Sequence, residues 1–275
     1  MAASIFERTL STAAMDAAFG DAALVGAMLE FEAALAASLA EEGAIPAAAA
    51  AAIEAACRVE RFDLEAMVVE ARSAGSLAIP LVRMLTAQVV AADPAAAPFV
   101  HRGSTSQDVI DTAMVLATRR ALVPIDADLL RLCDALAVLA RAHAATPQLA
   151  RTLLQPAEVT SFGFKVAGWR APLLRARVRL AGAAEAALQL QFGGAVGTLA
   201  AYGARGPAIA RRLGARLALS VPPVAWHVQR DAWAGLGCEL ALLCGSLGKI
   251  GRDLALLAQG EVGEVAEPHA PGRGG

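Results

Sequence analysis

The sequence predicts an all-α protein in which an N-terminal helical domain is followed by a bundle of long helices. The chain is rich in Ala, Leu, Arg and Glu, which favour helix, and its single Tyr and few β-branched runs leave little material for a sheet. After Phe99, three stretches keep a helical apolar periodicity over about thirty residues or more. Helices of that length bury their apolar stripes against one another, which indicates a bundle.

The first domain is expected over residues 1–98 and contains several helices of modest length. Asp21 is placed to cap one of them, and Pro46 suits the first turn of the next. Asp63 can cap a third helix, which should end by Gly75.

The second domain is expected over residues 99–275 and holds the long helices. These are expected from Ser106 to about Ala145 with an interruption near Pro124, from about Ala157 to Leu188, and from about Asp231 to Gln259. Three long helices do not close a bundle, and the last residues, Pro271-Gly272-Arg273-Gly274-Gly275, are typical of a flexible loop. The bundle is therefore expected to be partial in this chain, with its C-terminal part missing.

The composition excludes several classes of protein. A formal net charge of −2 and a pI near 6.1 provide no basic field for nucleic acid or an anionic membrane. Although 57% of the residues are hydrophobic, the longest uncharged stretch, Ala186 to Ala204, contains two Gln and several Gly, and no segment is expected to span a membrane. The N-terminus lacks a signal-peptide core, so the protein is expected in the cytoplasm. The four Cys lack metal-site spacing and are expected to be buried structural thiols.

Candidate functional residues fall near the ends of the long helices, and the first group precedes the helix from Ser106. Thr105 and Asp108 fit a capping box, in which groups at the start of a helix bind one another. The first N–H groups of a helix also attract anions, and with Thr105, Ser106 and His101 beside them they could bind a carboxylate. The alternative is that Thr105 or Ser106 only caps the helix.

Two further groups lie at either end of the second long helix. Gln155 and Lys165, at its entry, could hold a polar ligand, or could simply mark a solvated helix start. The segment Gln191 to Thr198, after its end, lacks the G-x-G-x-x-G spacing of a dinucleotide-binding loop. Its glycines, Gly194 among them, could leave N–H groups free to face a developing negative charge, or could form a flexible turn.

A last group precedes the third long helix and combines an imidazole, an amide and a guanidinium from His227, Gln229 and Arg230. Arg230 can bind a carboxylate through two parallel hydrogen bonds, whereas the alternative is a surface His beside an ion pair. All four groups suit an anion. Together they predict a pocket for a small polycarboxylate.

Five motifs, spread in order over nearly the whole chain, resemble those of the fumarase/aspartase superfamily. They are His101-x-Gly103-x-Thr105-Ser106-Gln107-Asp108, Arg151-Thr152-x-Leu154-Gln155, Gln191-Phe192-Gly193-Gly194-Ala195-x-Gly197, Trp226-His227-x-Gln229-Arg230-Asp231 and Gly245-Ser246-Leu247-Gly248-Lys249-x-Gly251-Arg252-Asp253. Within the superfamily the likeness is strongest to the bacterial 3-carboxy-cis,cis-muconate cycloisomerase family.

The resemblance implies an all-helical homotetramer whose active sites each combine segments of three subunits. It implies lactonisation of 3-carboxy-cis,cis-muconate to 4-carboxymuconolactone in the protocatechuate branch of the β-ketoadipate pathway, with no metal and no organic cofactor. The substrate-binding residues that it implies are His101, Thr105, Ser106, Gln155, Lys165, Gly194, His227, Gln229 and Arg230.

Two departures from the family pattern bear on activity. Leu153 stands where many elimination members carry His, which favours a cycloisomerase over an amine or water lyase. The family pattern continues beyond Gly275 into a mobile loop whose serine transfers the proton, so no catalytic residue is assigned in this chain, and the 275 residues alone are expected to have little or no activity. Two alternatives stay open: a fumarate-releasing lyase of the adenylosuccinate or argininosuccinate type, and a helical scaffold without catalysis.

Overall fold

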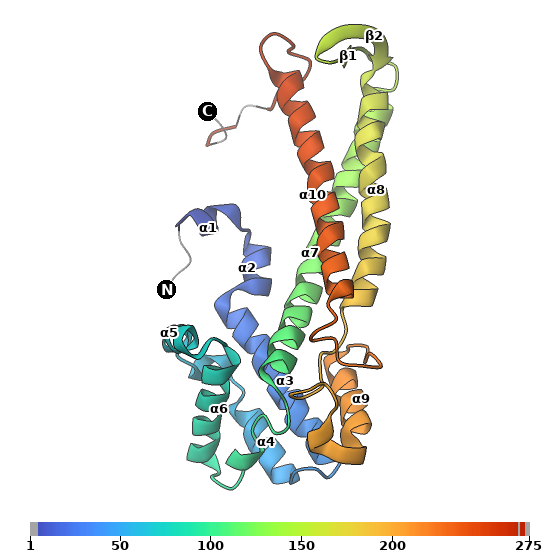
Figure 1. The fold of residues 1–275 in the computed structure, drawn as a ribbon. Coiled ribbons are helices and arrows are strands. Elements are labelled where there is room, and N and C mark those ends of the chain that lie inside the picture. The colour runs from blue at the N-terminus through green and yellow to red at the C-terminus, as the bar shows by residue number, and fades with distance from the viewer. Residues whose placement is uncertain (1–4, 269, 273–275) are drawn as a thin grey trace. The chain divides into compact units, whose positions relative to one another are not determined.

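The computed structural model describes residues 5–268 and 270–272 and confirms the all-α class (Figure 1). The elements before the first long helix are α1 (Ile5–Leu10), α2 (Ala13–Phe19), α3 (Asp21–Glu41), α4 (Ala47–Ala56), the 3-10 turn η1 (Val59–Arg61), α5 (Leu64–Ala74), α6 (Ala78–Ala92) and the 3-10 turn η2 (Ala97–Phe99). The following elements are α7 (Ser106–Ala142), β1 (Pro147–Thr152), β2 (Gln155–Ser161), α8 (Phe162–Ala187), the 3-10 helix η3 (Ala200–Arg205), α9 (Gly206–Leu217) and α10 (Asp231–Ala258).

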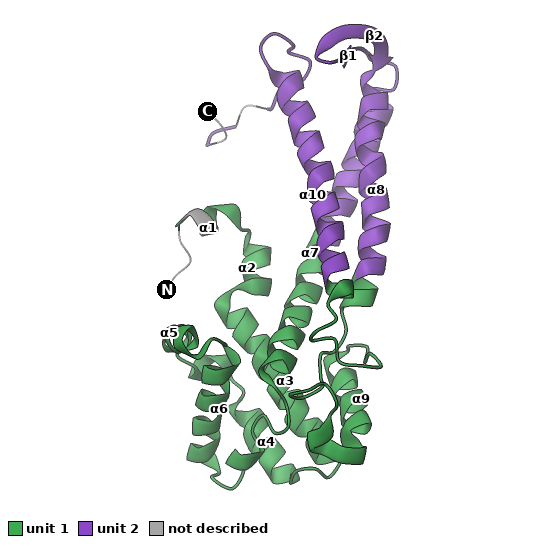
Figure 2. Cartoon of the chain, in the orientation of Figure 1, with its two compact units in different colours: residues 1–125, 184–233 green, residues 126–183, 234–275 purple. Residues whose placement is uncertain are grey.

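The chain divides into two compact units, each assembled from two separate stretches of sequence (Figure 2). Unit 1 consists of residues 1–125 and 184–233, and unit 2 of residues 126–183 and 234–275. The boundary expected at residues 98 and 99 does not coincide with this division. The reason is that the first part of α7 and one face of α9 contribute buried side chains to the same core as the N-terminal helices.

Short-range signals placed both ends of α5 in unit 1 correctly. Asp63 caps α5, as predicted, by accepting a 3.0 Å hydrogen bond from the N–H of the third helical residue, and Gly75 ends that helix with a left-handed φ of 71°. Pro46 directly precedes α4. Asp21 is not a cap, because Gly20 takes the N-cap position and Asp21 is the first residue of α3.

The first long helix continues through Pro124 without the expected interruption. Proline lacks an N–H group, so one intrahelical hydrogen bond is missing at this position. Burial of Ala121 and Leu129 on either side offsets that loss. The third long helix begins at Asp231, as predicted.

The largest difference from the sequence prediction lies between α7 and α8, where a β-hairpin occupies the expected start of the second long helix. Strands β1 and β2 pair antiparallel with Thr152 opposite Gln155, and α8 begins only at Phe162. Leu153 and Leu154 form the turn with φ values of 49° and 63°, which costs about 1–2 kcal/mol for each non-glycine residue. Their side chains are 96% and 72% exposed. The turn therefore holds two apolar side chains in solvent on a backbone that leucine disfavours.

The segment Ala13–Glu41 is long and apolar enough to cross a membrane by length and composition alone. Within the described residues it is the one segment of this kind, and 56% of its most apolar window is buried in the protein. In unit 1 its helix α3 lines the core through Phe31 and Leu35, which belong to the same buried cluster as Leu85 of α6 and Ile209 of α9. Buried core helices pass the same test of length and composition.

Unit 2 is built around three long helices, namely the second part of α7, α8 and α10 (Figure 2). Helix α10 buries one residue in seven along its length, a coiled-coil type of spacing: Leu236, Leu243, Ile250 and Leu257. Polar side chains join the helices, since the Trp169 Nε1–H of α8 donates to Asp253 of α10 at 2.6 Å, and Arg170 donates to the Cys133 carbonyl of α7 at 2.9 Å. Burial of so narrow a stripe leaves most of α10 uncovered.

A test of packing in unit 2 is available at Gly163, where α8 begins. A Cβ atom added there would lie 2.4 Å from the Ala140 carbonyl oxygen and 2.8 Å from the Ala144 Cα, both backbone atoms. We expect Gly163→Ala to lower the free energy of unfolding by about 2 kcal/mol, because backbone atoms cannot rotate out of the way. Urea denaturation followed by circular dichroism measures this change.

The matched control is Gly182→Ala in the same helix, because a Cβ atom at Gly182 would meet nothing within 4 Å. This substitution should raise stability by up to about 1 kcal/mol through helix propensity. Similar losses in the two variants would contradict the assignment of Gly163 to a close backbone approach.

Candidate active site

The predicted anion site at the start of α7 contains a carboxylate of the protein itself. The Thr105 N–H donates to Asp108 Oδ2 at 3.1 Å, which is the backbone half of the predicted capping box, and the Ser104 hydroxyl donates to the same oxygen at 3.2 Å. Asp108 is completely buried, whereas Thr105 and Ser106 are half-buried. The hydroxyl groups of Thr105 and Ser106 therefore lie next to a position that is already negatively charged.

The glycine loop that follows α8 donates to the same carboxylate. Asp108 Oδ1 accepts from the Gln191 side-chain amide and the Gly193 N–H, both at 3.0 Å, and Oδ2 accepts from the Gly194 N–H at 2.9 Å. This corrects the expectation that the Gly193 and Gly194 amides are free to face a developing negative charge on a substrate. Five donors therefore bind one buried carboxylate, and none of the five is a basic side chain. The positive end of the α7 dipole further stabilises the negative charge of Asp108.

His101 lies just before this cap and binds a carboxylate that the sequence did not indicate. Its Nδ1 is 2.6 Å from Oε1 of Glu32 on α3, and Glu32 has no exposed side-chain surface. Burial by itself lowers the pKa of His101. The charge of Glu32, its hydrogen bond and the charge of Asp108 raise that pKa by more, so that the net effect is upward.

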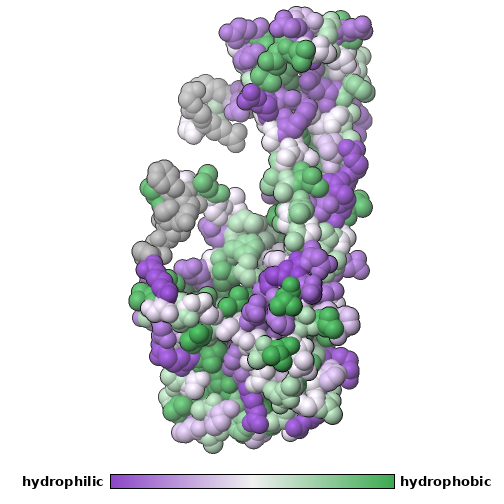
Figure 3. All heavy atoms as spheres, in the orientation of Figure 1, coloured by the Kyte–Doolittle hydropathy of each residue, from purple (hydrophilic) through white to green (hydrophobic). Residues whose placement is uncertain are grey.

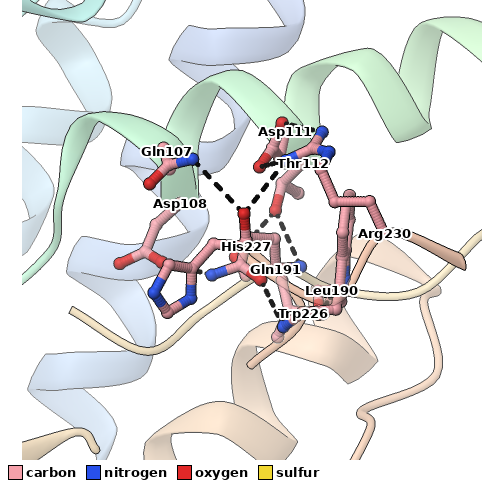
Figure 4. A network of polar contacts seen from close by, with 9 residues as sticks. All are labelled: Gln107, Asp108, Asp111, Thr112, Leu190, Gln191, Trp226, His227 and Arg230. Atoms are coloured by element: carbon pink, nitrogen blue, oxygen red, sulfur yellow. Dashed lines mark hydrogen bonds and ion pairs between the residues drawn. The ribbon is translucent and has the colours of Figure 1, made fainter. Parts of the chain in front are cut away.

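Arg230 forms the two-pronged pair that its sequence suggested, but with a residue of the same chain (Figure 4). Its Nη1 and Nη2 donate to Asp111 of α7 at 2.9 and 2.8 Å, and its guanidinium lies 5.1 Å from the centre of the Trp226 ring. Arg230 Nη1 also donates to the His227 carbonyl at 3.3 Å. The expectation that Arg230 binds a substrate carboxylate is thus corrected, because both of its Nη groups donate to Asp111.

Buried Gln191 connects the glycine loop to the segment that carries His227 (Figure 4). Its side-chain oxygen accepts from the Trp226 N–H at 2.8 Å, and its backbone exchanges two hydrogen bonds with the Thr112 hydroxyl.

His227 has a buried Nδ1 without a hydrogen-bond partner among the described residues. A Cβ atom on Gly197, whose φ is 77°, would lie 2.8 Å from this imidazole, so only glycine fits there. Gln229 is exposed and lines an adjoining cavity of about 250 Å³.

The structure therefore brings seven of the predicted residues into one polar region of unit 1: His101, Thr105, Ser106, Gly194, His227, Gln229 and Arg230. The remaining two, Gln155 and Lys165, belong to unit 2. Lys165 lines a cleft of about 580 Å³ together with Arg151 and Lys249, and Gln155 is exposed at the start of β2. Unit 2 thus offers three cationic side chains around a single cleft.

A carboxylate of unit 2 lies close to these cations. Glu264 accepts from Arg151 Nη2 and from the Gln148 amide, both at 2.7 Å, and the hydrogen bond from Arg151 is the main reason that its pKa is lowered. Within the described residues, no three His, Cys, Asp or Glu side chains are arranged to hold a metal ion.

Three acidic residues organise unit 1, and sequence reasoning gave only one of them a role. Asp108 was expected in the helix cap but not as the acceptor for the glycine loop. Glu32 and Asp111 were missed, although each is an acidic residue on the buried side of a largely apolar helical stretch. That pattern is the signal that could have identified them, because a buried carboxylate requires a partner.

Comparison with known proteins identifies the family. A family model described as lyase matches residues 7–275. The chain belongs to this lyase family. The resemblance to the fumarase/aspartase superfamily is thereby confirmed.

Relatives within the lyase family include more than one kind of enzyme. The chain is 50% identical over 97% of its length to a 3-carboxy-cis,cis-muconate cycloisomerase of Bradyrhizobium diazoefficiens, and covers 59% of that protein. It is 47% identical over 94% of its length to a nitrosuccinate lyase of Streptomyces davaonensis, and covers 56% of it. The crystal structure of a 3-carboxy-cis,cis-muconate lactonizing enzyme from Pseudomonas putida matches with a TM-score of 0.94 at 45% identity, over 96% of this chain and 60% of that one. The chain thus spans about three fifths of the length of these members of the lyase family.

A substitution at Asp108 tests the network on which this lyase-family site is built. Asp108→Asn removes the charge and turns an NH2 group toward donors that then lack an acceptor. We expect it to lower the free energy of unfolding by about 2–3 kcal/mol, measured by urea denaturation.

Asp128→Asn serves as the control, because Asp128 is 67% exposed and pairs with Arg131, three residues away on the same helix. Its unfolding free energy should stay within about 0.5 kcal/mol of the wild type. Equal unfolding midpoints for the Asp108 and Asp128 variants would contradict a central role for Asp108.

Proposed function

We propose that this chain belongs to an enzyme that lactonises 3-carboxy-cis,cis-muconate to 4-carboxymuconolactone, a step in the protocatechuate branch of the β-ketoadipate pathway. The observation that carries the proposal is 50% identity, over 97% of this chain, to a protein named for that reaction. The TM-score of 0.94 to a lactonizing enzyme supports it as well. The small polycarboxylate that the site residues indicate is consistent with this substrate.

The chemistry of lactonisation suits the groups of unit 1. One substrate carboxylate oxygen bonds to a carbon of a conjugated double bond, and the π electrons move into a neighbouring carboxylate, which gives a doubly charged, carbanion-like intermediate. A proton added to the carbanion carbon, which the resemblance assigns to the loop serine, then completes the lactone. Fixed donors must stabilise that charge. The donors that we propose are His101, Thr105 and Ser106 for one carboxylate, with His227 and Gln229 for another. We propose that Arg230 and Gly194 act indirectly, by holding the His227 segment and the glycine loop in place.

We further propose that the enzyme is a homotetramer whose long helices pack against those of other subunits. Several apolar side chains of unit 2 support this, since Phe164 and Val178 of α8 are each 74% exposed and Leu242 of α10 is 54% exposed. Apolar residues also reach the surface along these helices in the face shown in Figure 3. In such an assembly Gln155 and Lys165 would reach the substrate from a different subunit than His101. We also propose that the enzyme works in the cytoplasm, without metal or organic cofactor.

A second candidate function is elimination from a substituted succinate, with release of fumarate as in the adenylosuccinate and argininosuccinate lyases. The observation that favours it is 47% identity to a nitrosuccinate lyase. Leu153 argues against it, because an apolar side chain at the hairpin turn cannot accept or donate a proton.

The function is tested by assaying the whole enzyme, this chain together with the serine-bearing loop that the resemblance implies, with 3-carboxy-cis,cis-muconate and following the loss of absorbance of its conjugated diene. We expect little or no turnover by residues 1–275 alone and turnover by the wild-type whole enzyme. In the whole enzyme Ser106→Ala should lower kcat/KM about 10- to 100-fold, because a hydrogen bond to a charged group contributes about 1.5–3 kcal/mol. The exposed Ser73 of α5 provides the control, and Ser73→Ala should keep wild-type activity.

Two results would overturn the proposal. Release of fumarate from adenylosuccinate, argininosuccinate or nitrosuccinate, without lactonisation, would establish the second function. Unchanged activity of Ser106→Ala would remove Ser106 from the substrate-binding groups.

A further inference from the structure

Glu32 is a buried charge in the apolar core of unit 1. It lies on α3 among Met28, Phe31 and Leu35, and its side chain has no exposed surface. Oε1 contacts His101 Nδ1 at 2.6 Å, whereas Oε2 is buried without a partner among the described residues. A carboxylate in such a place is costly unless a positive charge balances it.

The other titratable groups that face this pair do not supply that charge. Burial, with help from the charge of Glu32, raises the pKa of Cys57 to about 12, so the thiol is neutral. Burial likewise raises the pKa of Tyr202, whose hydroxyl donates to the Arg102 carbonyl at 2.7 Å, and the Arg102 side chain itself is exposed. Asp108 adds a second negative charge near His101. The imidazolium of His101 is therefore the cation that balances Glu32.

The backbone of His101 fits a fixed role for its side chain. Its φ of 53° is left-handed, a conformation that costs a non-glycine residue about 1–2 kcal/mol. Strained residues of this kind occur where the surrounding structure dictates their geometry, and the Glu32 contact is such a restraint. With Nδ1–H directed at Glu32, Nε2 is the ring nitrogen left for another partner.

We propose that Glu32 is a positioning residue, which fixes the His101 ring through Nδ1 and keeps it as an imidazolium whose Nε2–H donates to a substrate carboxylate. The role in binding rests on the function proposed above, whereas the pairing of Glu32 with His101 does not. A neutral ring with its proton on Nδ1 would present a lone pair at Nε2 and would repel a carboxylate. Charge on His101 thus decides whether the ring attracts or repels the substrate.

The sign of the resulting pH dependence follows from the raised pKa of His101. The stability that the pair contributes is fully present below the unfolded pKa of about 6.5 and is lost as the pH rises through the folded value. Substrate binding should weaken over the same range. KM should therefore rise with pH, with a smaller change in kcat.

The experiment compares the wild-type whole enzyme with its Glu32→Gln variant, which keeps the shape of the side chain and removes its charge. NMR titration of isotope-labelled histidine, with the His101 signal assigned through His101→Asn, should show His101 titrating at lower pH in Glu32→Gln than in the wild type. At neutral pH kcat/KM should fall about tenfold, mainly through KM, because a charge-assisted hydrogen bond is roughly twice as strong as a neutral one.

Glu30→Gln is the matched control, because Glu30 lies two residues away on the same helix, is 40% exposed and pairs with Arg120 on the surface. It should change neither the His101 titration nor KM. Should Glu32→Gln fail to fold, Glu32→Asp is the second variant. It keeps the charge but places it one methylene group farther from His101, so His101 should still titrate at lower pH than in the wild type.

An unchanged His101 titration in the folded Glu32 variant would overturn the proposal, as would a lowered titration without any change in KM. Failure of the proposed function gives a different pattern. The wild type would then not turn over 3-carboxy-cis,cis-muconate, while the NMR titration would still report whether Glu32 controls the charge of His101.

Discussion

The buried carboxylate of Asp108 is the interaction on which the polar region of unit 1 depends. It accepts five hydrogen bonds, from the loop before α7, from the Gln191 side chain and from two consecutive glycine amides. Donors and acceptor lie up to 86 residues apart in sequence. One side chain thus determines where the cap of α7 and the glycine loop meet, and Gln191 extends this order to Trp226 and to the segment with His227.

Three acidic side chains of unit 1 show how the protein neutralises its own potential anion site. Asp108 accepts hydrogen bonds at the start of α7, Asp111 pairs with the guanidinium of Arg230, and Glu32 pairs with Nδ1 of His101. Groups that the sequence presents as substrate ligands are therefore arranged by internal carboxylates. The groups left for a ligand are the half-buried hydroxyls of Thr105 and Ser106, and the polar side-chain atoms of His101, His227 and Gln229. Rigid donors of this kind need no rearrangement when charge develops on a substrate.

The fold and the site were predictable from sequence to different degrees. Asp63 and Gly75 marked the ends of α5 correctly, because capping depends on residues within one turn. The hairpin before α8 was missed, since its strands carry few β-branched residues and its turn residues, Leu153 and Leu154, are not turn formers. Glu32 and Asp111 were missed for a related reason: their partners are 69 and 119 residues away, and no local pattern reports contacts of that range.

The discontinuity of unit 1 has a consequence for how the protein is made. Residues 126–183 interrupt this unit and form part of unit 2, and the donors from Gln191, Gly193 and Gly194 lie beyond the interruption. On the ribosome, the first 125 residues leave the exit tunnel with Asp108 still lacking three of its five partners. Unit 1 can close only after the inserted helical hairpin and a further fifty residues have been translated. Until then the nascent chain carries an incomplete core, and its exposed apolar side chains make it prone to aggregation.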